Sequence, residues 1–305
     1  MSNKPSILIL GTGAMAGLFG GRLASYAEVT LLGNWTEGIT ALRADGIRLL
    51  DNGETVAASV RATDDPSDCE GAISALVLVK SWQTEAAGKM LAECLAPDGV
   101  ALTLQNGLGN IEVLEAAIGA ERAALGVTTS GATLIGPGTV RVGGNGPTHV
   151  APHPRLEPIV DLLESAGFEM HAASDLASLV WGKLAINAGI NALTALLEVR
   201  NGELLERSHA RSLMNEAAAE TAHVAQAQGI ELPYDDPVRE VEGVAERTAE
   251  NESSMLQDIR RRAPTEVDAI NGAVVREGKR YGVSTPVNWS LWNLVRAKVE
   301  KLVSD

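Results

Sequence analysis

The sequence of 305 residues is poor in cysteine, in basic side chains and in long apolar runs. Its two cysteines, Cys69 and Cys94, have no Cys-x-x-Cys spacing, so we expect two buried thiols rather than a disulfide framework or a zinc site. Lys and Arg number 25 against 39 Asp and Glu, and the net charge of −14 argues against a nucleic-acid partner. No uninterrupted run of about 18 apolar residues occurs, so we expect no membrane span.

Three further absences narrow the class of protein. The N-terminal residues lead directly into a strand-like segment without the apolar stretch of a secretory signal, which favours a cytoplasmic protein. His149 and His153 are separated by Pro152 and the other histidines are scattered, so no metal site is expected. A Gly-x-Ser-x-Gly elbow is lacking, which disfavours a serine hydrolase.

The apolar sequence that is present is enough for two folded domains. Hydrophobic residues make up 45% and charged residues 21%, which excludes global disorder. At about 150 residues per domain, the length predicts two domains. In the first half, short apolar runs alternate with helical stretches, as in a βαβ series. We expect strands at residues 7–10, 29–32, 73–79 and 100–104, and helices at residues 13–27, 83–95 and 110–117.

The continuous apolar character of these strands is typical of a parallel sheet that is buried on both faces. The first half therefore predicts an α/β fold with a doubly wound sheet, and residues 128–150, rich in Gly, Thr and Val, predict a few antiparallel strands. The second half reads as almost entirely helical. Its expected helices span residues 175–198, 212–228, 236–251, 265–281 and 287–303. We place the domains at residues 1–174 and 175–305.

A glycine-rich loop follows the first expected strand and opens the first expected helix. It consists of Gly11, Thr12, Gly13, Ala14, Met15 and Ala16. The first glycine allows a tight turn, the second lets a pyrophosphate approach the backbone, and Ala16 keeps the helix close to the strand. Helix N-terminal amides then face the phosphates. The loop predicts dinucleotide binding, and the alternative is an ordinary glycine-rich turn.

Polar residues at the ends of other expected strands refine this prediction. The second strand ends at Gly33-Asn34 with no acid before Glu37, which argues against a standard NAD site. Lys80 ends a buried strand, so it is either a ligand of the cofactor or a lysine at the point where the strand reaches solvent. Asn106 ends the strand at 100–104 and offers a donor and an acceptor beside the nicotinamide. For Asn106 the alternative is a simple Asn-Gly turn.

The helical half contains a polar stripe within apolar sequence. Lys183, Asn187 and Asn191 recur at four-residue intervals, so a helix places them on one face. Buried polar groups require partners, which makes this stripe a candidate site. Desolvation would lower the pKa of Lys183 and a neighbouring carboxylate would raise it, and the sequence leaves the balance open.

Two later polar segments favour structural roles when judged by spacing alone. A polar cluster over residues 251–258 precedes the basic run 260–262, which is typical of a solvated face. Thr265, with Asp268 three residues on, predicts a helix N-cap at 265. In that position Glu266 would complement the helix dipole.

Taken together, the motifs resemble those of the ketopantoate reductases (2-dehydropantoate 2-reductases), over nearly the whole chain. Besides the glycine loop, the resemblance is carried by Lys80-Ser81-Trp82-Gln83, Gln105-Asn106-Gly107, Trp181-Gly182-Lys183-Leu184 with Asn187 and Asn191, Ser253-Ser254-Met255-Leu256-Gln257-Asp258, and Thr265-Glu266-Val267-Asp268-Ala269-Ile270-Asn271-Gly272. It implies a Rossmann-like domain followed by an all-helical domain. It also implies NADPH-dependent reduction of ketopantoate to pantoate, a step towards pantothenate and coenzyme A.

The resemblance implies roles for single residues near the cofactor and the substrate. Lys183 would be the general acid, and Glu266 would be its acidic partner. Asn106 would lie where cofactor and substrate meet, and Lys80 with Gln83 would approach the adenosine 2′-phosphate. The residues that would hold the hydroxyl and carboxylate of the substrate are Asn187, Asn191, Asn251 and Ser254.

One departure from the family pattern concerns the cofactor. Family members typically carry an arginine for the 2′-phosphate just after the second strand, where this chain has Asn34. NADPH is therefore expected, with a weaker preference over NADH. The alternatives are a reductase of another branched 2-oxo acid and a non-catalytic NADP-binding regulator, and the presence of both Lys183 and Glu266 argues against the regulator. Whether the protein forms a homodimer is left undecided by the sequence.

Overall fold

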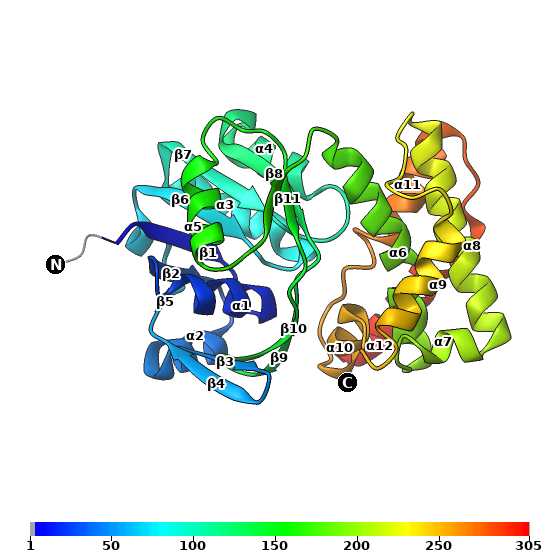
Figure 1. Cartoon of the computed structure of the whole chain (residues 1–305), viewed down its shortest axis with the longest axis horizontal. Helices are drawn as coiled ribbons and strands as arrows, with labels where there is room; N and C mark the ends of the chain where they lie inside the picture. The colour runs from blue at the N-terminus through cyan, green and yellow to red at the C-terminus, as the bar shows by residue number, and fades with distance from the viewer. Residues whose placement is uncertain (1–3, 305) are drawn as a thin grey trace. The chain divides into compact units, whose positions relative to one another are not determined.

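An eight-stranded sheet dominates the first of the two units into which the chain divides (Figure 1). The structure, a computed structural model, describes residues 4–304. Unit 1 comprises the chain up to Gln105 together with Asn110–Leu176. Unit 2 comprises the loop Asn106–Gly109 and the chain from Ala177 onward. The chain thus leaves unit 1 for one short loop and returns to it before the helical half begins.

The large sheet is parallel at its centre, as the sequence predicts. Its strand order is β12-β11-β8-β7-β6-β1-β2-β5, and only β11 runs antiparallel to its neighbour β8. The strands are β1 (Ser6–Leu10), β2 (Glu28–Leu32), β5 (Arg61–Thr63), β6 (Ala72–Val77), β7 (Leu95–Thr103), β8 (Ala123–Thr128), β11 (Thr148–Val150) and β12 (Met170–Ala172). In the register of the pairs, Leu10 lies beside both Leu32 and Val77, so β1, β2 and β6 end at the same edge.

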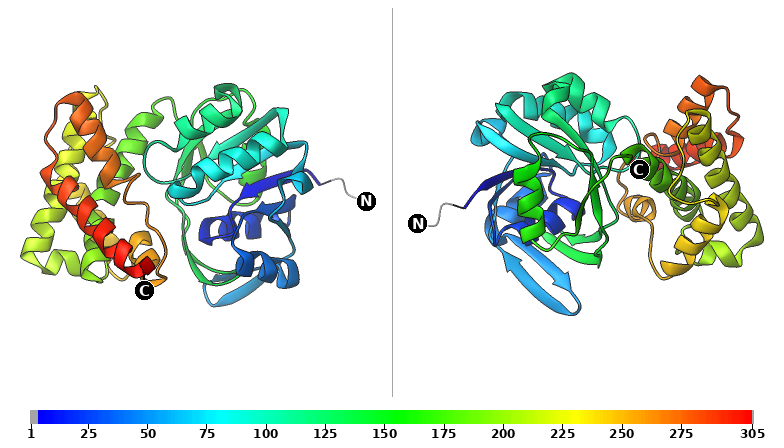
Figure 2. Two further views of the ribbon diagram at one scale, coloured as in Figure 1. Left: turned by 180° about the vertical axis from the view of Figure 1, so that it is seen from behind. Right: turned by 45° about the horizontal axis from the view of Figure 1, so that its top comes forward.

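A second, four-stranded sheet packs on the other side of helix α1 (Ala14–Leu23). Its order is β4-β3-β10-β9, with β3 (Ile47–Asp51), β4 (Glu54–Ala58), β9 (Gly131–Gly136) and β10 (Thr139–Gly144). A Cβ on Gly17 would lie 2.5 Å from Cγ2 of Val140, so this glycine lets the helix approach β10 closely. The antiparallel strands expected in 128–150 are present, and the projecting β3–β4 hairpin joins them (Figure 2).

The helices of unit 1 follow the predicted alternation, with additions. The helices after α1 are α2 (Thr36–Asp45), α3 (Thr84–Cys94), α4 (Asn110–Ile118) and α5 (Glu157–Ser165). Short 3₁₀ helices are η1 (Pro66–Cys69), η2 (Ser81–Gln83) and η3 (Ala120–Arg122). Cys69 and Cys94 are free and buried, as expected, and burial raises the pKa of the Cys94 thiol to about 11.

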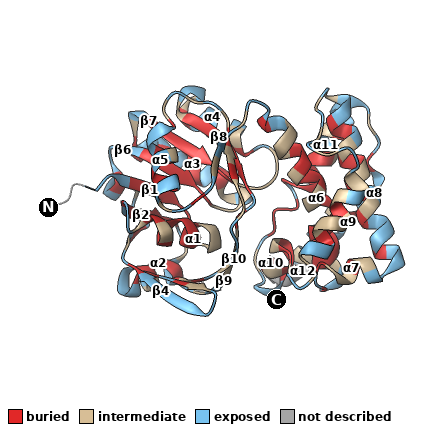
Figure 3. Cartoon of the chain, in the orientation of Figure 1, coloured by how far each residue is buried: buried red, intermediate tan, exposed pale blue. Residues whose placement is uncertain are grey.

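Unit 2 is helical, and its buried residues are spread over several of its helices (Figure 3). Its helices are α6 (Leu176–Leu197), α7 (Glu203–Glu206), α8 (Ser208–Ala227), α9 (Pro237–Arg247), α10 (Ser254–Arg260), α11 (Asn271–Tyr281) and α12 (Pro286–Ser304). Within residues 4–304, α6 is the one helix that is long and apolar enough to cross a membrane. The sequence lacks an uninterrupted apolar run of that length, so no such helix was expected. Because 67% of its apolar window is buried inside the protein, α6 serves as a core helix.

The helix expected from Thr265 begins later, at Asn271, so the predicted N-cap is wrong. The amides of Ala269 and Ile270 both donate to the carbonyl of Glu266 at 3.0 Å, and ψ of Ile270 is −94°, which interrupts the helical path. Tertiary contacts explain why these residues do not form a helix. Val267 and Ile270 are buried, and the amide of Leu108 donates to the carbonyl of Ala269 at 2.9 Å. The dipole role predicted for Glu266 therefore has no helix N-terminus on which to act.

A buried carboxylate joins α8 to the start of α12. Glu220, 8% exposed, accepts hydrogen bonds from the amides of Val287 at 2.8 Å and Asn288 at 2.9 Å. It also accepts one from the side-chain amide of Asn288 at 2.8 Å. Asn271 donates to Asn288 Oδ1 and to the carbonyl of Ala188, each at 3.0 Å, so the network reaches α11 and α6.

Candidate active site

The glycine loop lies between the ends of β2 and β6, the two strands that flank β1 in the sheet. The amide of Gly11 donates to the carbonyl of Leu32 at 2.8 Å, and the amide of Leu78 donates to the carbonyl of Leu10 at 2.9 Å. Gly11 has φ +123°, and a Cβ there would lie 3.2 Å from the carbonyl of Leu78. Only glycine fits this position without strain.

The loop leaves an open space at the N-terminus of α1. Among residues 4–304, and apart from Gly13 and its two chain neighbours, no atom lies within 4 Å of the position that a Cβ of Gly13 would take. As in any α-helix, the first-turn amides of α1, including those of Ala14 and Met15, have no intrahelical partner. Gly13, the N-cap residue, has no side chain that could accept from them. Thr12 and Ala16 are buried. Free amides around an open space suit a pyrophosphate.

The structure brings Lys80, Gln83 and Asn34 together beside this loop. Gln83 Nε2 donates to Asn34 Oδ1 at 3.4 Å, and the amide of Lys80 donates to Gln83 Oε1 at 3.3 Å. Asn34 follows β2 and Lys80 follows β6, so both flank the loop that follows β1. Asn34 adds an amide and no charge, and Lys80 supplies the positive charge in this group.

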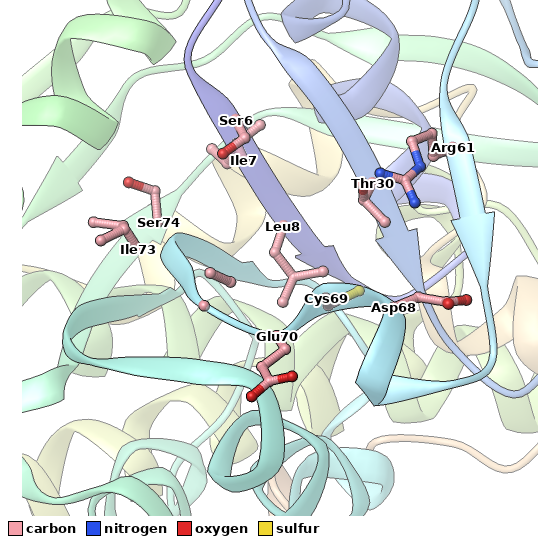
Figure 4. Close-up of a pocket in the computed structure, with 12 residues that line it drawn as sticks. Ser6, Ile7, Leu8, Thr30, Arg61, Asp68, Cys69, Glu70, Ile73 and Ser74 are labelled. Atoms are coloured by element: carbon pink, nitrogen blue, oxygen red, sulfur yellow. The ribbon is translucent and has the colours of Figure 1, made fainter.

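A pocket at the opposite edge of the sheet is separate from these residues. It is lined by the first residues of β1 and β6 and by the turn of η1, among them Ser6, Ser74, Arg61 and Cys69 (Figure 4). Parallel strands have their carboxyl ends at the other edge, where ligands of open α/β sheets bind. No residue predicted to bind cofactor or substrate lines this pocket.

The polar stripe of α6 lies within the core of unit 2. Asn191 is 7% exposed, and Lys183 and Asn187 are partly buried among apolar residues. Burial lowers the pKa of Lys183 from 10.5 to about 8, and the negative charge of Glu266 acts in the opposite direction. Desolvation thus outweighs the carboxylate, which resolves the balance that the sequence left open. A lysine of this kind can release a proton near neutral pH.

Glu266 is held next to Asn106 within unit 2. Glu266 is 5% exposed, and Asn106 Nδ2 donates to Glu266 Oε2 at 3.5 Å. Gly107 has φ +82°, and a Cβ there would lie 2.4 Å from the carbonyl oxygen of Ala269. The Asn106–Gly109 loop therefore packs directly on the segment that carries Glu266. Lys183, Glu266 and Asn106 form one cluster, joined by charge and by this hydrogen bond.

Ser254 and Asn251 lie near the other end of the stripe. Ser253 is the N-cap of α10 and accepts from the amide of Leu256 at 3.1 Å. The hydroxyl of Thr194, on α6, donates to Ser253 Oγ at 2.6 Å and ties the start of α10 to this helix. Ser254 is partly buried, whereas Asn251 is exposed and its carbonyl accepts from the amide of Asn201 at 3.0 Å.

Two polar residues of this region were not singled out from the sequence. Thr194 continues the stripe one turn beyond Asn191, and that spacing could have identified it. Asn201 is 7% exposed and donates to Thr248 Oγ1 at 2.9 Å. Among the residues that the structure describes, its Oδ1 has no hydrogen-bond partner. No local pattern marks Asn201, because it follows the end of α6.

The fold and these residues define a class: Rossmann-type oxidoreductases with a helical second unit. The chain matches the model of ketopantoate reductase PanE/ApbA over residues 7–155 and that of the C-terminal part of this family over residues 175–299. It is 37% identical over 299 residues to a 2-dehydropantoate 2-reductase of Halobacterium salinarum, covering 95% of this chain and 97% of that protein. A 2-dehydropantoate 2-reductase of Archaeoglobus fulgidus is 38% identical over 299 residues, with 95% and 96% covered. The chain belongs to the ketopantoate reductase family.

Solved structures agree with this membership. A PanE/ApbA family ketopantoate reductase from Ralstonia eutropha superposes with a TM-score of 0.91 at 31% identity, covering 97% of this chain and 99% of that one. A D-mandelate dehydrogenase in complex with NADH and anilino(oxo)acetate superposes with a TM-score of 0.89 at 30% identity and the same coverage.

Proposed function

We propose that this protein reduces ketopantoate to pantoate with NADPH. The observation that carries the proposal is the cluster of Lys183, Glu266 and Asn106, which combines a proton donor of lowered pKa with a buried carboxylate. Full-length relatives named 2-dehydropantoate 2-reductase support the choice of substrate. We assign cofactor binding to residues 1–174 and substrate binding to residues 175–305 together with Asn106.

The residues of the glycine loop fit the cofactor. The open space at Gly13 and the free amides of α1 would hold the pyrophosphate. Lys80 and Gln83, next to Asn34, would contact the adenosine 2′-phosphate. When bound, NADPH supplies a hydride to the carbonyl carbon of the substrate.

Lys183 acts as the general acid in this proposal. As the carbonyl carbon gains the hydride, negative charge develops on the carbonyl oxygen, and the ammonium group beside it stabilises that charge. A proton then passes from Nζ of Lys183 to this oxygen and completes the hydroxyl group. With a pKa of about 8, Lys183 is protonated near neutral pH and still a good donor. Glu266 keeps the lysine charged by raising its pKa.

The remaining polar residues would orient the 2-oxo acid. Asn187 and Asn191 share the α6 face with Lys183, so they can bind groups next to the carbonyl. Asn251 and Ser254 would complete the partners for the hydroxyl and the carboxylate. Asn106 would contact both cofactor and substrate.

We also propose that the reaction takes place in the cytoplasm on a small-molecule substrate, without nucleic acid or membrane. The free thiols Cys69 and Cys94 fit a reducing compartment.

A second candidate is the reduction of another 2-oxo acid with NADH. It is favoured by the uncharged Asn34 beside the cofactor loop and by the likeness to a D-mandelate dehydrogenase whose structure was solved with NADH. Lys183 and Glu266 are compatible with both reductases, because the chemistry at the carbonyl is the same.

One assay separates these candidates. The oxidation of NADPH and of NADH is followed with ketopantoate, 2-oxoisovalerate and benzoylformate. We expect the highest kcat/KM with ketopantoate, because polar groups built to bind a hydroxyl lose about 1–3 kcal/mol or more when it is missing. Equal kcat/KM for ketopantoate and 2-oxoisovalerate would contradict the assignment of the substrate, and preference for benzoylformate with NADH would favour the second candidate.

A further inference from the structure

The segment that carries Glu266 has no regular secondary structure of its own. Residues 264–270 lie between α10 and α11 and form turns rather than a helix. Their position therefore depends on contacts with neighbouring elements. One such contact is the hydrogen bond from Leu108 to Ala269, described above.

A second contact comes from a tryptophan on α12. Trp292 Nε1 donates to Asp268 Oδ1 at 2.7 Å, two residues beyond Glu266. The side chain of Arg276, on α11, donates to the carbonyl of Asp268 at 2.9 Å. The guanidinium of Arg296 lies over the Trp292 ring at 5.6 Å from its centroid. Asp268 is thus fixed through both its side chain and its backbone.

Gly272 provides the space for this indole. A Cβ on Gly272 would lie 2.9 Å from Nε1 and 3.0 Å from Cε2 of Trp292, so any larger residue would displace the ring. Asp268 and Gly272 both belong to the segment 265–272, one of the motifs that carry the family resemblance. Neither is among the residues proposed to act in catalysis or binding. Asp268 accepts the hydrogen bond of the Trp292 indole, and Gly272 leaves room for its ring.

We propose that Trp292 is a positioning residue for Glu266. By holding Asp268, the indole N–H fixes the irregular segment so that the Glu266 carboxylate stays next to Asn106 and within reach of the charge of Lys183. The inference rests on the proposed function, in which Glu266 and Lys183 act on a 2-oxo acid. It adds a residue on α12 to the elements that set the geometry of the reaction.

The substitution Trp292→Phe tests this, because it removes the N–H donor and keeps an aromatic ring. We expect kcat/KM for ketopantoate to fall about tenfold, since displacements of roughly 1 Å caused by remote substitutions can cost up to 10²-fold. Glu266 raises the pKa of Lys183, so a displaced carboxylate lowers that pKa. The alkaline limb of the kcat/KM profile should then move to lower pH, while the Kd of NADPH stays unchanged.

Companion variants show whether the effect passes through Asp268. Trp289→Phe is the matched control, because Trp289 lies on the same helix and is 56% exposed. Asp268→Asn keeps an acceptor oxygen and should remain close to wild type, whereas Asp268→Ala should reproduce Trp292→Phe. The double variant Trp292→Phe/Asp268→Ala should be no worse than either single variant, since both remove the same contact. Where Trp292→Phe does not fold, Asp268→Ala decides the question.

A lowered Tm with unchanged kcat/KM and pH profile would overturn the inference, because it would show a structural role only. The pKa of Lys183 is also measured directly by NMR titration of its side chain in wild type, Trp292→Phe and Trp289→Phe. If the wild type reduces none of the 2-oxo acids, the proposed function fails, and the titration still decides the positioning role. An unchanged Lys183 pKa in Trp292→Phe would overturn it.

Discussion

Asn106 and Glu266 are distant in the sequence, yet Nδ2 of the asparagine lies 3.5 Å from Oε2 of the glutamate. The Asn106–Gly109 loop groups with unit 2, although the strand before it belongs to unit 1. Gly107 makes this possible, because its positive φ and missing Cβ let the loop lie against Ala269. An asparagine at a strand end thereby shares one environment with a carboxylate between two helices.

The first prediction concerns the proton donor. Lys183→Ala should lower kcat by about 10²–10⁴-fold, the usual loss when a general acid is removed. The Kd of NADPH, measured by fluorescence, should hardly change, because the glycine loop lies in unit 1. Lys279→Ala, an exposed lysine on α11, is the control. Wild-type turnover of Lys183→Ala with saturating ketopantoate would refute the mechanism.

The second prediction concerns the pH dependence. In the wild type, kcat/KM should fall as the pH rises through about 8, since deprotonated Lys183 cannot donate a proton. Glu266→Gln removes the charge that raises the pKa of Lys183, so the fall should begin at lower pH. We also expect a large decrease in kcat/KM with a nearly unchanged Tm. A clear loss of Tm with normal turnover would instead make Glu266 a structural residue.

Much of the fold could be predicted from the sequence where the apolar pattern is strong. The buried strands β1, β6 and β7 appear as continuous apolar runs, and the core helix α6 as a long helical pattern. The β3–β4 hairpin was missed because β4 is exposed along most of its length and shows no alternation. The start of α11 was misplaced because contacts of Val267 and Ile270 override the local capping signal at Thr265.

The candidate site was predicted only in part by spacing. Helical periodicity alone put Lys183, Asn187 and Asn191 on one face. Spacing gave no reason to join Glu266 to Lys183, because the electrostatic effect of Glu266 on Lys183 depends on the position of an irregular segment between two helices. The hydrogen bond between Gln83 and Asn34 also escaped the sequence, since it links the ends of strands that are not neighbours in the sheet.

The third prediction concerns the cofactor. Lys80→Ala should weaken NADPH binding by about 10–100-fold and NADH binding much less, because a hydrogen bond to a charged group contributes about 1.5–3 kcal/mol. Asn34→Arg should strengthen the preference for NADPH by adding a bidentate partner for the phosphate. Titrations with both cofactors measure the change. Equal losses for NADPH and NADH in Lys80→Ala would mean that Lys80 does not contact the 2′-phosphate.

The last prediction concerns the stability of unit 2. Glu220 is buried and accepts three hydrogen bonds at the start of α12. Glu220→Ala leaves these donors unpaired, and at about 1–3 kcal/mol for a buried unsatisfied group we expect unfolding to become easier by about 3 kcal/mol. Thermal and urea denaturation measure the loss. Glu216→Ala, one turn earlier on α8 and exposed, should change the free energy of unfolding by less than about 0.5 kcal/mol. Equal stability of the two variants would show that the buried network does not stabilise the helical unit.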